Sequence, residues 1–149
     1  MDIIEQIRES NMIEGIFREP LEREIIAHRE FLKLDQIKID DLQAFVSVYQ
    51  PDALLRAGAG MNVTVGAHIP PPGGMSIVYR LDDLLAEVNS ELVDPWTAHV
   101  RYECLHPFTD GNGRSGRVLW YWMMRKQPRK AALGFLHAFY YQTLDRARE

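Results

Sequence analysis

Residues 106–117 have the sequence His106-Pro107-Phe108-Thr109-Asp110-Gly111-Asn112-Gly113-Arg114-Ser115-Gly116-Arg117, between two expected helices at about 95–105 and 113–125. Proline disfavours helical geometry in the residue before it, so the first helix should end at His106 and present the imidazole from a loop. The Gly-Asn-Gly run permits unusual backbone angles that can turn successive N–H groups toward an anion. The N-terminus of the following helix attracts negative charge as well.

The charged side chains of this segment point to phosphate chemistry. Arg114 and Arg117 are three residues apart, so they share a helix face and can form forked, charge-assisted bonds to phosphate. Asp110 supplies a hard oxygen, as in Mg²⁺ sites shared between one carboxylate and substrate phosphates. His106 can gain or lose a proton near neutral pH. These residue types at this spacing predict phosphoryl or nucleotidyl transfer.

Most of the remaining chain has helical periodicity. Apolar residues repeat every three or four positions in segments near 2–13, 20–33, 40–50, 81–91 and 130–146. Two short β-branched stretches, 62–65 and 76–79, surround a Pro/Gly turn and predict a small hairpin. We therefore expect a mostly α-helical single domain over residues 1–149 with a small β-hairpin.

Composition excludes several classes of protein. The 149 residues contain one cysteine, Cys104, which excludes an internal disulfide framework and a zinc site built on paired cysteines. The longest apolar run, 118–124, is far short of the roughly 20 residues of a membrane span. The start of the chain has no basic, apolar leader, so we expect a cytoplasmic protein, or one delivered to a host cytosol. Acidic residues dominate 1–100 and basic residues dominate 101–149, a division typical of solvated surfaces or of a masked basic site.

The segment 106–117 resembles the signature of Fic-domain proteins, H-P-F-x-[DE]-G-N-G-R-x-x-R, at every specified position. Ala98-His99 precedes it as in many family members, and Val65-Gly66-Ala67-His68-Ile69-Pro70-Pro71 is similar to the family's flap. Tyr140-Tyr141 matches a tyrosine pair of the helix after the signature. The resemblance spans about 56–145 and implies a Fic-type helical domain with a hairpin flap.

The resemblance implies transfer of AMP from ATP to a Ser, Thr or Tyr hydroxyl of a target protein. His106 would take the hydroxyl proton, and Asp110 would hold Mg²⁺. The residues that would bind the nucleotide are Gly111, Asn112, Gly113, Arg114 and Arg117 for the phosphates, Val65, Gly66, Ala67 and His68 for the flap, and Tyr140 and Tyr141 for the nucleoside.

An N-terminal segment, Ser10-Asn11-Met12-Ile13-Glu14-Gly15, is similar to the family's inhibitory motif [ST]-x-x-x-E-[GN]. The resemblance implies that residues 1–18 form an inhibitory helix region, in which Glu14 pairs with Arg117 and blocks the γ-phosphate. Ser10 would steady the end of that helix. Glutamate in this place also assists removal of AMP in some relatives. Three roles of Glu14 therefore stay open: an inhibitor, a residue that assists AMP removal, or an ordinary exposed acid.

Other functions remain open on the sequence. A Fic-fold enzyme could use another nucleotide, transfer phosphate or remove AMP. Alternatively, a non-catalytic module could bind a nucleotide with Arg114, Arg117 and the Gly-Asn-Gly main chain. Self-modification and a homodimer are further alternatives. A membrane partner is not expected, and the basic run 125–130 is better explained by a helix C-terminus than by nucleic acid. His28, His99 and His137 are expected to be structural, and Arg56 and Arg148 receive no role.

Overall fold

The computed structural model describes residues 2–126 and 140–148. The described part is mostly helical, which confirms the predicted fold class. Its helices are α1 (Ile3–Ile13), α2 (Glu22–Leu32), α3 (Ile39–Tyr49), α4 (Met75–Asn89), α5 (Pro95–Leu105), α6 (Asn112–Met124) and α8 (Tyr140–Arg148). No helix in these ranges is both long and apolar enough to cross a lipid bilayer.

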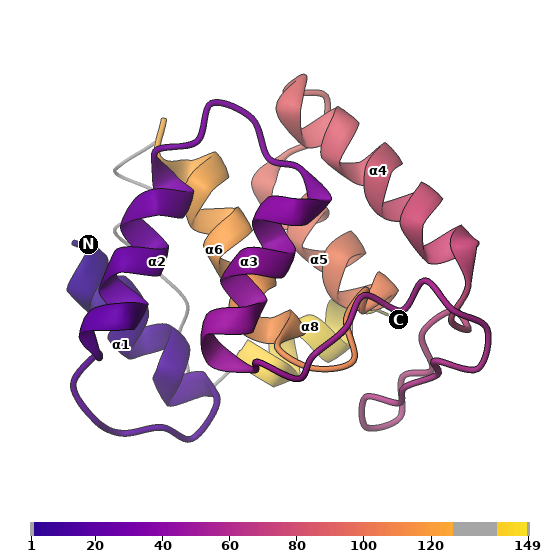
Figure 1. Ribbon diagram of the computed structural model, residues 1–149, viewed down its shortest axis with the longest axis horizontal. Coiled ribbons are helices and arrows are strands. Elements are labelled where there is room, and N and C mark those ends of the chain that lie inside the picture. The colour runs from indigo at the N-terminus through magenta and orange to yellow at the C-terminus, as the bar shows by residue number, and fades with distance from the viewer. Residues whose placement is uncertain (1, 127–139, 149) are drawn as a thin grey trace.

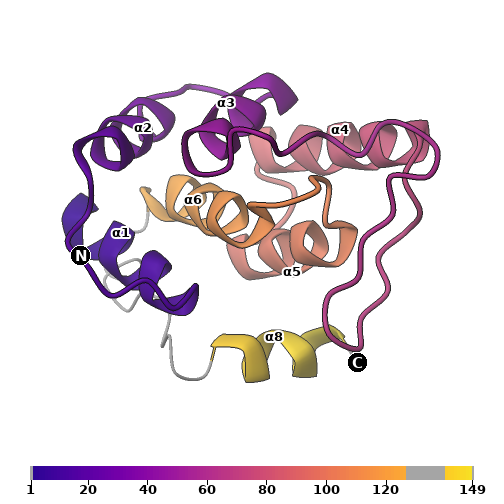
Figure 2. The same cartoon turned by 60° about the horizontal axis from the view of Figure 1, so that its bottom comes forward.

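The helices form layers around α5 and α6, which contact each other extensively along the centre of the molecule. Figure 2 shows α2, α3 and α4 in a row over α6 and α5, with α8 on the opposite side of α5. α1 contacts both α2 and α6. The main core fills the space between these layers and includes Phe31, Leu42, Phe45, Leu81, Leu85, Tyr102, Val118 and Leu119.

Local sequence signals account for the helix ends that matter for the site. α1 begins at a capping box, in which Asp2 accepts from the Glu5 N–H at 2.8 Å and Glu5 accepts from the Asp2 N–H at 3.0 Å. It ends just before Gly15, whose φ is +75°. α5 begins with Pro95 behind the capping residue Asp94. Glu14 and His106 are the residues at the C-terminal ends of α1 and α5.

The predicted second strand, residues 76–79, is wrong. This stretch lies in the first turns of α4, which begins at Met75 rather than near residue 81 (Figure 1). Ile77 belongs to a helical stripe, because it is buried in register with Leu81, Leu84 and Leu85. Tertiary burial therefore decides the conformation against a local strand preference.

What remains of the predicted hairpin is a single antiparallel bridge between Val65 and His68. A second bridge, between Leu55 and Phe108, joins the segment before it to the signature. The last predicted helix, 130–146, is observed from Tyr140 onward as α8. Residues 127–139, with His137, lie outside the described residues.

Candidate functional site

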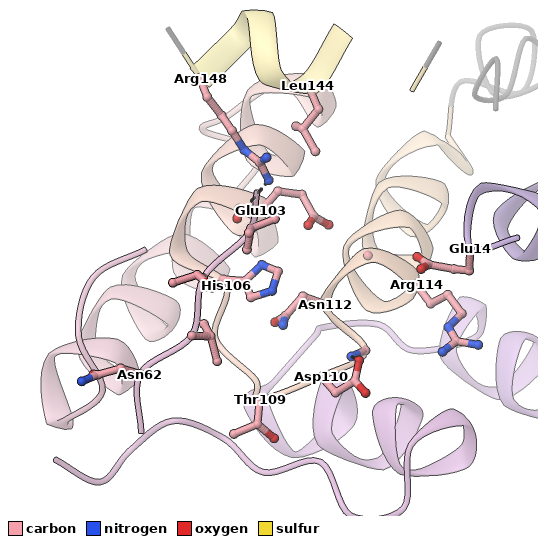
Figure 3. Close-up of a pocket in the computed structure, with 15 residues that line it drawn as sticks. Glu14, Asn62, Glu103, His106, Thr109, Asp110, Asn112, Arg114, Leu144 and Arg148 are labelled. Atoms are coloured by element: carbon pink, nitrogen blue, oxygen red, sulfur yellow. Dashed lines mark hydrogen bonds between the residues drawn. The ribbon is translucent and has the colours of Figure 1, made fainter. Parts of the chain in front are cut away.

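A cleft of about 570 Å³ lies at the C-terminal end of α5 and the N-terminal end of α6. Figure 3 shows its walls, which come from the signature, the stretch 62–65, the end of α1, and α8. The polar side chains that line it are Glu14, Asn62, Thr64, Glu103, His106, Thr109, Asp110, Asn112, Arg114 and Arg148. Segments far apart in the sequence therefore meet at the predicted signature.

His106 caps the C-terminus of α5 in a left-handed conformation, with φ 51° and ψ 63°. Pro107 prevents the helix from continuing, and the His106 N–H still donates to the Tyr102 carbonyl at 2.9 Å. Positive φ is uncommon outside glycine and costs free energy, so surrounding contacts must hold this residue. In this conformation the imidazole points into the cleft (Figure 3).

Burial lowers the pKa of His106 to about 4, and the positive charges of Arg56, Arg148 and His68 act in the same direction. The main-chain carbonyl of Glu103 opposes the shift. The imidazole is therefore neutral at physiological pH. A neutral imidazole in a cleft can accept a proton from a bound hydroxyl group.

Asn112 holds the signature loop closed. Its Oδ1 accepts from the Phe108 N–H at 2.9 Å and its Nδ2 donates to the Phe108 carbonyl at 2.8 Å. Phe108 is fully buried and anchors the loop in the core. Of the residues predicted to cradle phosphate, Asn112 thus has its side chain committed to the loop, and only its main chain remains for an anion.

Gly111 and Gly113 surround the start of α6. Gly111 has φ +78°, and a Cβ there would lie 3.1 Å from Val46 Cγ1. A Cβ on Gly113 would lie 2.6 Å from Glu14 Oε1 and 3.0 Å from Arg117 Nη1. The Glu14 carboxylate therefore already lies at this helix N-terminus, where an anion is favoured.

The two signature arginines have different surroundings. The Arg114 guanidinium lies over the Tyr49 ring, 4.5 Å from its centroid, and lines the cleft. Arg117 is fully buried, and its Nη2 donates to Glu14 Oε1 at 2.6 Å. Ser10 also holds it, because the Arg117 Nε donates to Ser10 Oγ at 2.8 Å and Nη2 to the Ser10 carbonyl at 3.2 Å. The ion pair implied by the resemblance is present, and Ser10 contacts the arginine itself.

Asp110 lies exposed at the rim of the cleft, and its Oδ1 accepts from the Gly111 N–H at 2.7 Å. Within the described ranges, no group of three His, Cys, Asp or Glu residues could hold a metal ion by itself. One carboxylate beside a helix N-terminus that favours an anion fits Mg²⁺, which keeps several water ligands and is bound by few protein carboxylates. The donor set therefore suits an ion that binds together with an anionic ligand.

The four predicted flap residues have different surroundings in the structure. Val65 lines the cleft, together with Asn62, Val63 and Thr64. Gly66 and Ala67 form the exposed turn of the Val65–His68 bridge. The imidazole of His68 is directed to the main chain of α5, where its Nε2 lies 3.0 Å from the Cys104 carbonyl oxygen. Of these four predicted residues, Val65 is the one in the cleft wall.

The predicted tyrosines Tyr140 and Tyr141 begin α8, and their side chains lie outside the described part of the structure. Farther along α8, Leu144 and Arg148 line the cleft (Figure 3). Neither had been predicted as a site residue. The Arg148 Nη2 donates to the Glu103 carbonyl at 3.4 Å.

Glu103 is a further unpredicted residue of the cleft, and its side chain is almost fully buried. Burial raises its pKa to about 8, against the opposing charges of Arg117 and Arg148. Gly116 makes room for it, because a Cβ on that glycine would overlap Glu103 Oε1. The position of Glu103, one helical turn before His106, was the sequence signal that could have revealed it.

Part of the chain is similar to known proteins. The model of the Fic/DOC family matches residues 26–124, which include the signature and exclude α1. A protein adenylyltransferase Fic of Culex quinquefasciatus is 44% identical over 64 residues, 39% of this chain and 13% of the relative. Proteins of the same name from Drosophila willistoni and Drosophila mojavensis are 40% and 41% identical over the same lengths and shares. The match covers 13% of the length of these relatives.

Proposed function

The chain belongs to the Fic/DOC family, and from this premise we propose that it transfers AMP from ATP to a hydroxyl group of a protein. The observation that supports the proposal most is the His106 imidazole, which points into a cleft beside the N-terminus of α6, where an anion is favoured. Nucleotidyl transfer needs both a base for the hydroxyl proton and a site for the phosphates.

His106 acts as the general base in this proposal. The hydroxyl oxygen of a Ser, Thr or Tyr side chain forms a bond to the α-phosphorus while its proton passes to the imidazole. The bond from the α-phosphorus to the bridging oxygen of the β-phosphate breaks, and pyrophosphate leaves. The lowered pKa of His106 keeps the base unprotonated at neutral pH, and burial of the ring restricts its orientation.

The start of α6 binds the phosphates. Gly111 and Gly113 line the cleft at this helix N-terminus, and Arg114 adds a guanidinium that is held against Tyr49. Asp110 would hold Mg²⁺, which supplies charge neutralisation on the phosphates when it is bound. The nucleoside would extend toward α8, where Tyr140 and Tyr141 remain candidates for contact with it.

Glu14 inhibits the transfer in this proposal. Its carboxylate lies against Gly113 and pairs with Arg117, so it occupies the position that suits the outer phosphate of ATP. A carboxylate there blocks that phosphate sterically and repels it electrostatically. Productive binding of ATP therefore requires Glu14 to move away.

The target is a protein that presents an accessible hydroxyl group, and the chain can serve as its own target. The stretch from Asn62 to Val65 lines the same cleft as His106 and has few main-chain hydrogen bonds of its own. Such an exposed edge can align an extended target segment by main-chain pairing.

Labelled ATP tests which group is transferred. The Glu14→Gln variant is incubated with a cell lysate and ATP labelled at the α- or the γ-phosphate. Label on protein from α-labelled ATP alone is the expected result. Label from γ-labelled ATP would indicate phosphate transfer. An absence of both labels, with ATP binding retained, would contradict the transferase and favour a non-catalytic nucleotide-binding module.

A further inference from the structure

Arg56 is a fully buried arginine that is not among the functional residues described above. No carboxylate within the described ranges forms an ion pair with it. Its guanidinium instead donates to four main-chain carbonyl oxygens, those of Leu105, His106, Met61 and Pro71. Burial of a cation without a counter-charge costs free energy, and these four hydrogen bonds must offset that cost.

Two of the four bonds end α5. The Arg56 Nε donates to the His106 carbonyl at 2.7 Å and its Nη2 to the Leu105 carbonyl at 2.8 Å. The last carbonyls of a helix lack intrahelical partners, and a cation beside them also complements the helix dipole. The bonds thereby hold His106 in its left-handed conformation, which directs the imidazole into the cleft.

The other two bonds hold the segment 61–71, called the flap segment from here on. The Arg56 Nη1 donates to the Met61 carbonyl at 3.0 Å and to the Pro71 carbonyl at 2.9 Å. These carbonyls lie at the two ends of the flap segment, so one nitrogen joins both. Val65, which lines the cleft, lies between them.

The main chain of Arg56 strengthens both connections. Its N–H donates to the Pro107 carbonyl at 2.9 Å, next to His106. Its carbonyl accepts from the Gly74 N–H at 2.9 Å, just beyond the flap segment. Side chain and main chain of this one residue therefore bond to the signature on one side and to the flap segment on the other.

We infer that Arg56 is the positioning residue that fixes the flap segment and the His106 imidazole relative to each other. The catalytic meaning of this assignment rests on the proposed function, in which the flap segment aligns the hydroxyl that His106 deprotonates. A planar guanidinium with five N–H donors can reach carbonyls in two directions at once. The ammonium group of lysine keeps the charge but cannot make that fork.

Amide hydrogen exchange tests the inference without any assay of activity. In Arg56→Lys we expect the amides of Val65 and His68 to exchange about tenfold faster than in the parent, because the flap segment loses its anchor. Amides in the middle of α6 should keep their rates. The matched control is Arg101→Lys, which alters an exposed arginine of α5 that pairs with Glu87, and its flap amides should be unchanged.

Kinetics of labelling supply the second readout. In the Glu14→Gln background, Arg56→Lys should lower kcat about 100-fold, since a misplaced base loses most of its effect, while KM for ATP changes little. If Arg56 were purely structural, its substitution would lower the free energy of unfolding without lowering kcat selectively over KM. If flap exchange is faster in Arg56→Lys but Glu14→Gln transfers no AMP, the result would support the positioning role of Arg56. The same result would contradict the proposed function.

A measurement on the parent protein covers the case in which the variant fails to fold. The Arg56 Nε–H should be protected from exchange with solvent, because it donates to the His106 carbonyl inside the protein. Rapid exchange of that proton in the parent would overturn the inference. Equal flap exchange in a folded Arg56→Lys variant and the parent would overturn it as well.

Discussion

The Glu14 carboxylate lies 2.6 Å from the Arg117 Nη2, although 103 residues separate the two in the chain. The partners differ in burial: the Arg117 side chain is 0% exposed and that of Glu14 is 27% exposed. The acid can therefore return to water at small cost, whereas the arginine stays in place and keeps its bonds to Ser10. The proposed inhibition requires this asymmetry, in which Glu14 can leave while Arg117 stays in place.

Ser10→Ala should weaken the inhibition partially. The variant removes the hydroxyl that accepts from the buried Arg117 Nε, and an unsatisfied buried donor costs about 1–3 kcal/mol. We expect a lower free energy of unfolding in urea and more AMP transfer than in the parent, but less than in Glu14→Gln. The control is Ser47→Ala, since the exposed Ser47 hydroxyl bonds only within α3. Unchanged stability and transfer in Ser10→Ala would contradict the contact.

Ile13→Ala should release α1 without touching either partner of the ion pair. Ile13 is buried against Trp120, Tyr121 and Met124 on α6, and truncation of a buried isoleucine costs about 2–5 kcal/mol. We expect lower stability and increased AMP transfer, because α1 holds Glu14 over the site. Ile26→Ala, at an exposed position of α2, should change both little. A loss of stability with no gain in transfer would show that docking of α1 does not control the site.

Gly116→Ala should destabilise the protein by about 1–3 kcal/mol through overpacking. The added Cβ would overlap Glu103 Oε1 and lie 2.9 Å from Tyr102 Cδ1, between two closely packed helices. Gly58→Ala is the control, because its Cβ would meet the flexible Met61 side chain at 3.2 Å. Equal urea midpoints for the two variants would argue against the close approach of α5 and α6 at this point.

Stability should fall when the pH is lowered from 7 to 5.5. Burial lowers the pKa of His28 to about 4, of His99 to about 3 and of His106 to about 4, from an ordinary value of 6.5. Below pH 6.5 the unfolded chain therefore binds more protons at these sites than the folded chain, so acid favours unfolding. Each histidine contributes up to about 1.4 kcal/mol per pH unit in this window.

Glu103 offsets one of these histidines. Its pKa is raised to about 8, so the folded state binds one proton more than the unfolded state between pH 8 and its ordinary value of 4.5. Its contribution falls as the pH rises, opposite in sign to that of the histidines. Urea unfolding at pH 7 and 5.5 should still show lower stability at 5.5. Equal or higher stability at pH 5.5 would contradict the burial of the histidines.

Contiguous motifs in the sequence singled out several residues that line the cleft. The signature carries His106, Asp110 and Arg114 within nine residues. The resemblance of residues 10–15 to the inhibitory motif predicted that Glu14 pairs with Arg117. Arg56 could not be assigned, because its acceptors are main-chain carbonyls, which leave no mark in the side-chain sequence.

The remaining errors have physical causes. Arg148 lines the cleft because α8 contacts α5, a tertiary contact that no local pattern encodes. The stretch 76–79 was assigned to a strand because Ile77 and Val78 are β-branched, yet burial of Ile77 on a helical stripe determines its structure. Helix ends marked by Pro95 and Pro107 were predicted closely, since proline acts locally.

Transfer of label from α-labelled ATP in Glu14→Gln tests the central claim most directly. Loss of a charge-assisted bond worth about 1.5–3 kcal/mol should raise labelling roughly 10- to 100-fold over the parent. Adding His106→Asn should abolish it, and Glu19→Gln, which removes an exposed acid paired with Arg8, should match the parent. Equal labelling of Glu14→Gln and the parent, with ATP bound equally by both, would contradict autoinhibition by Glu14.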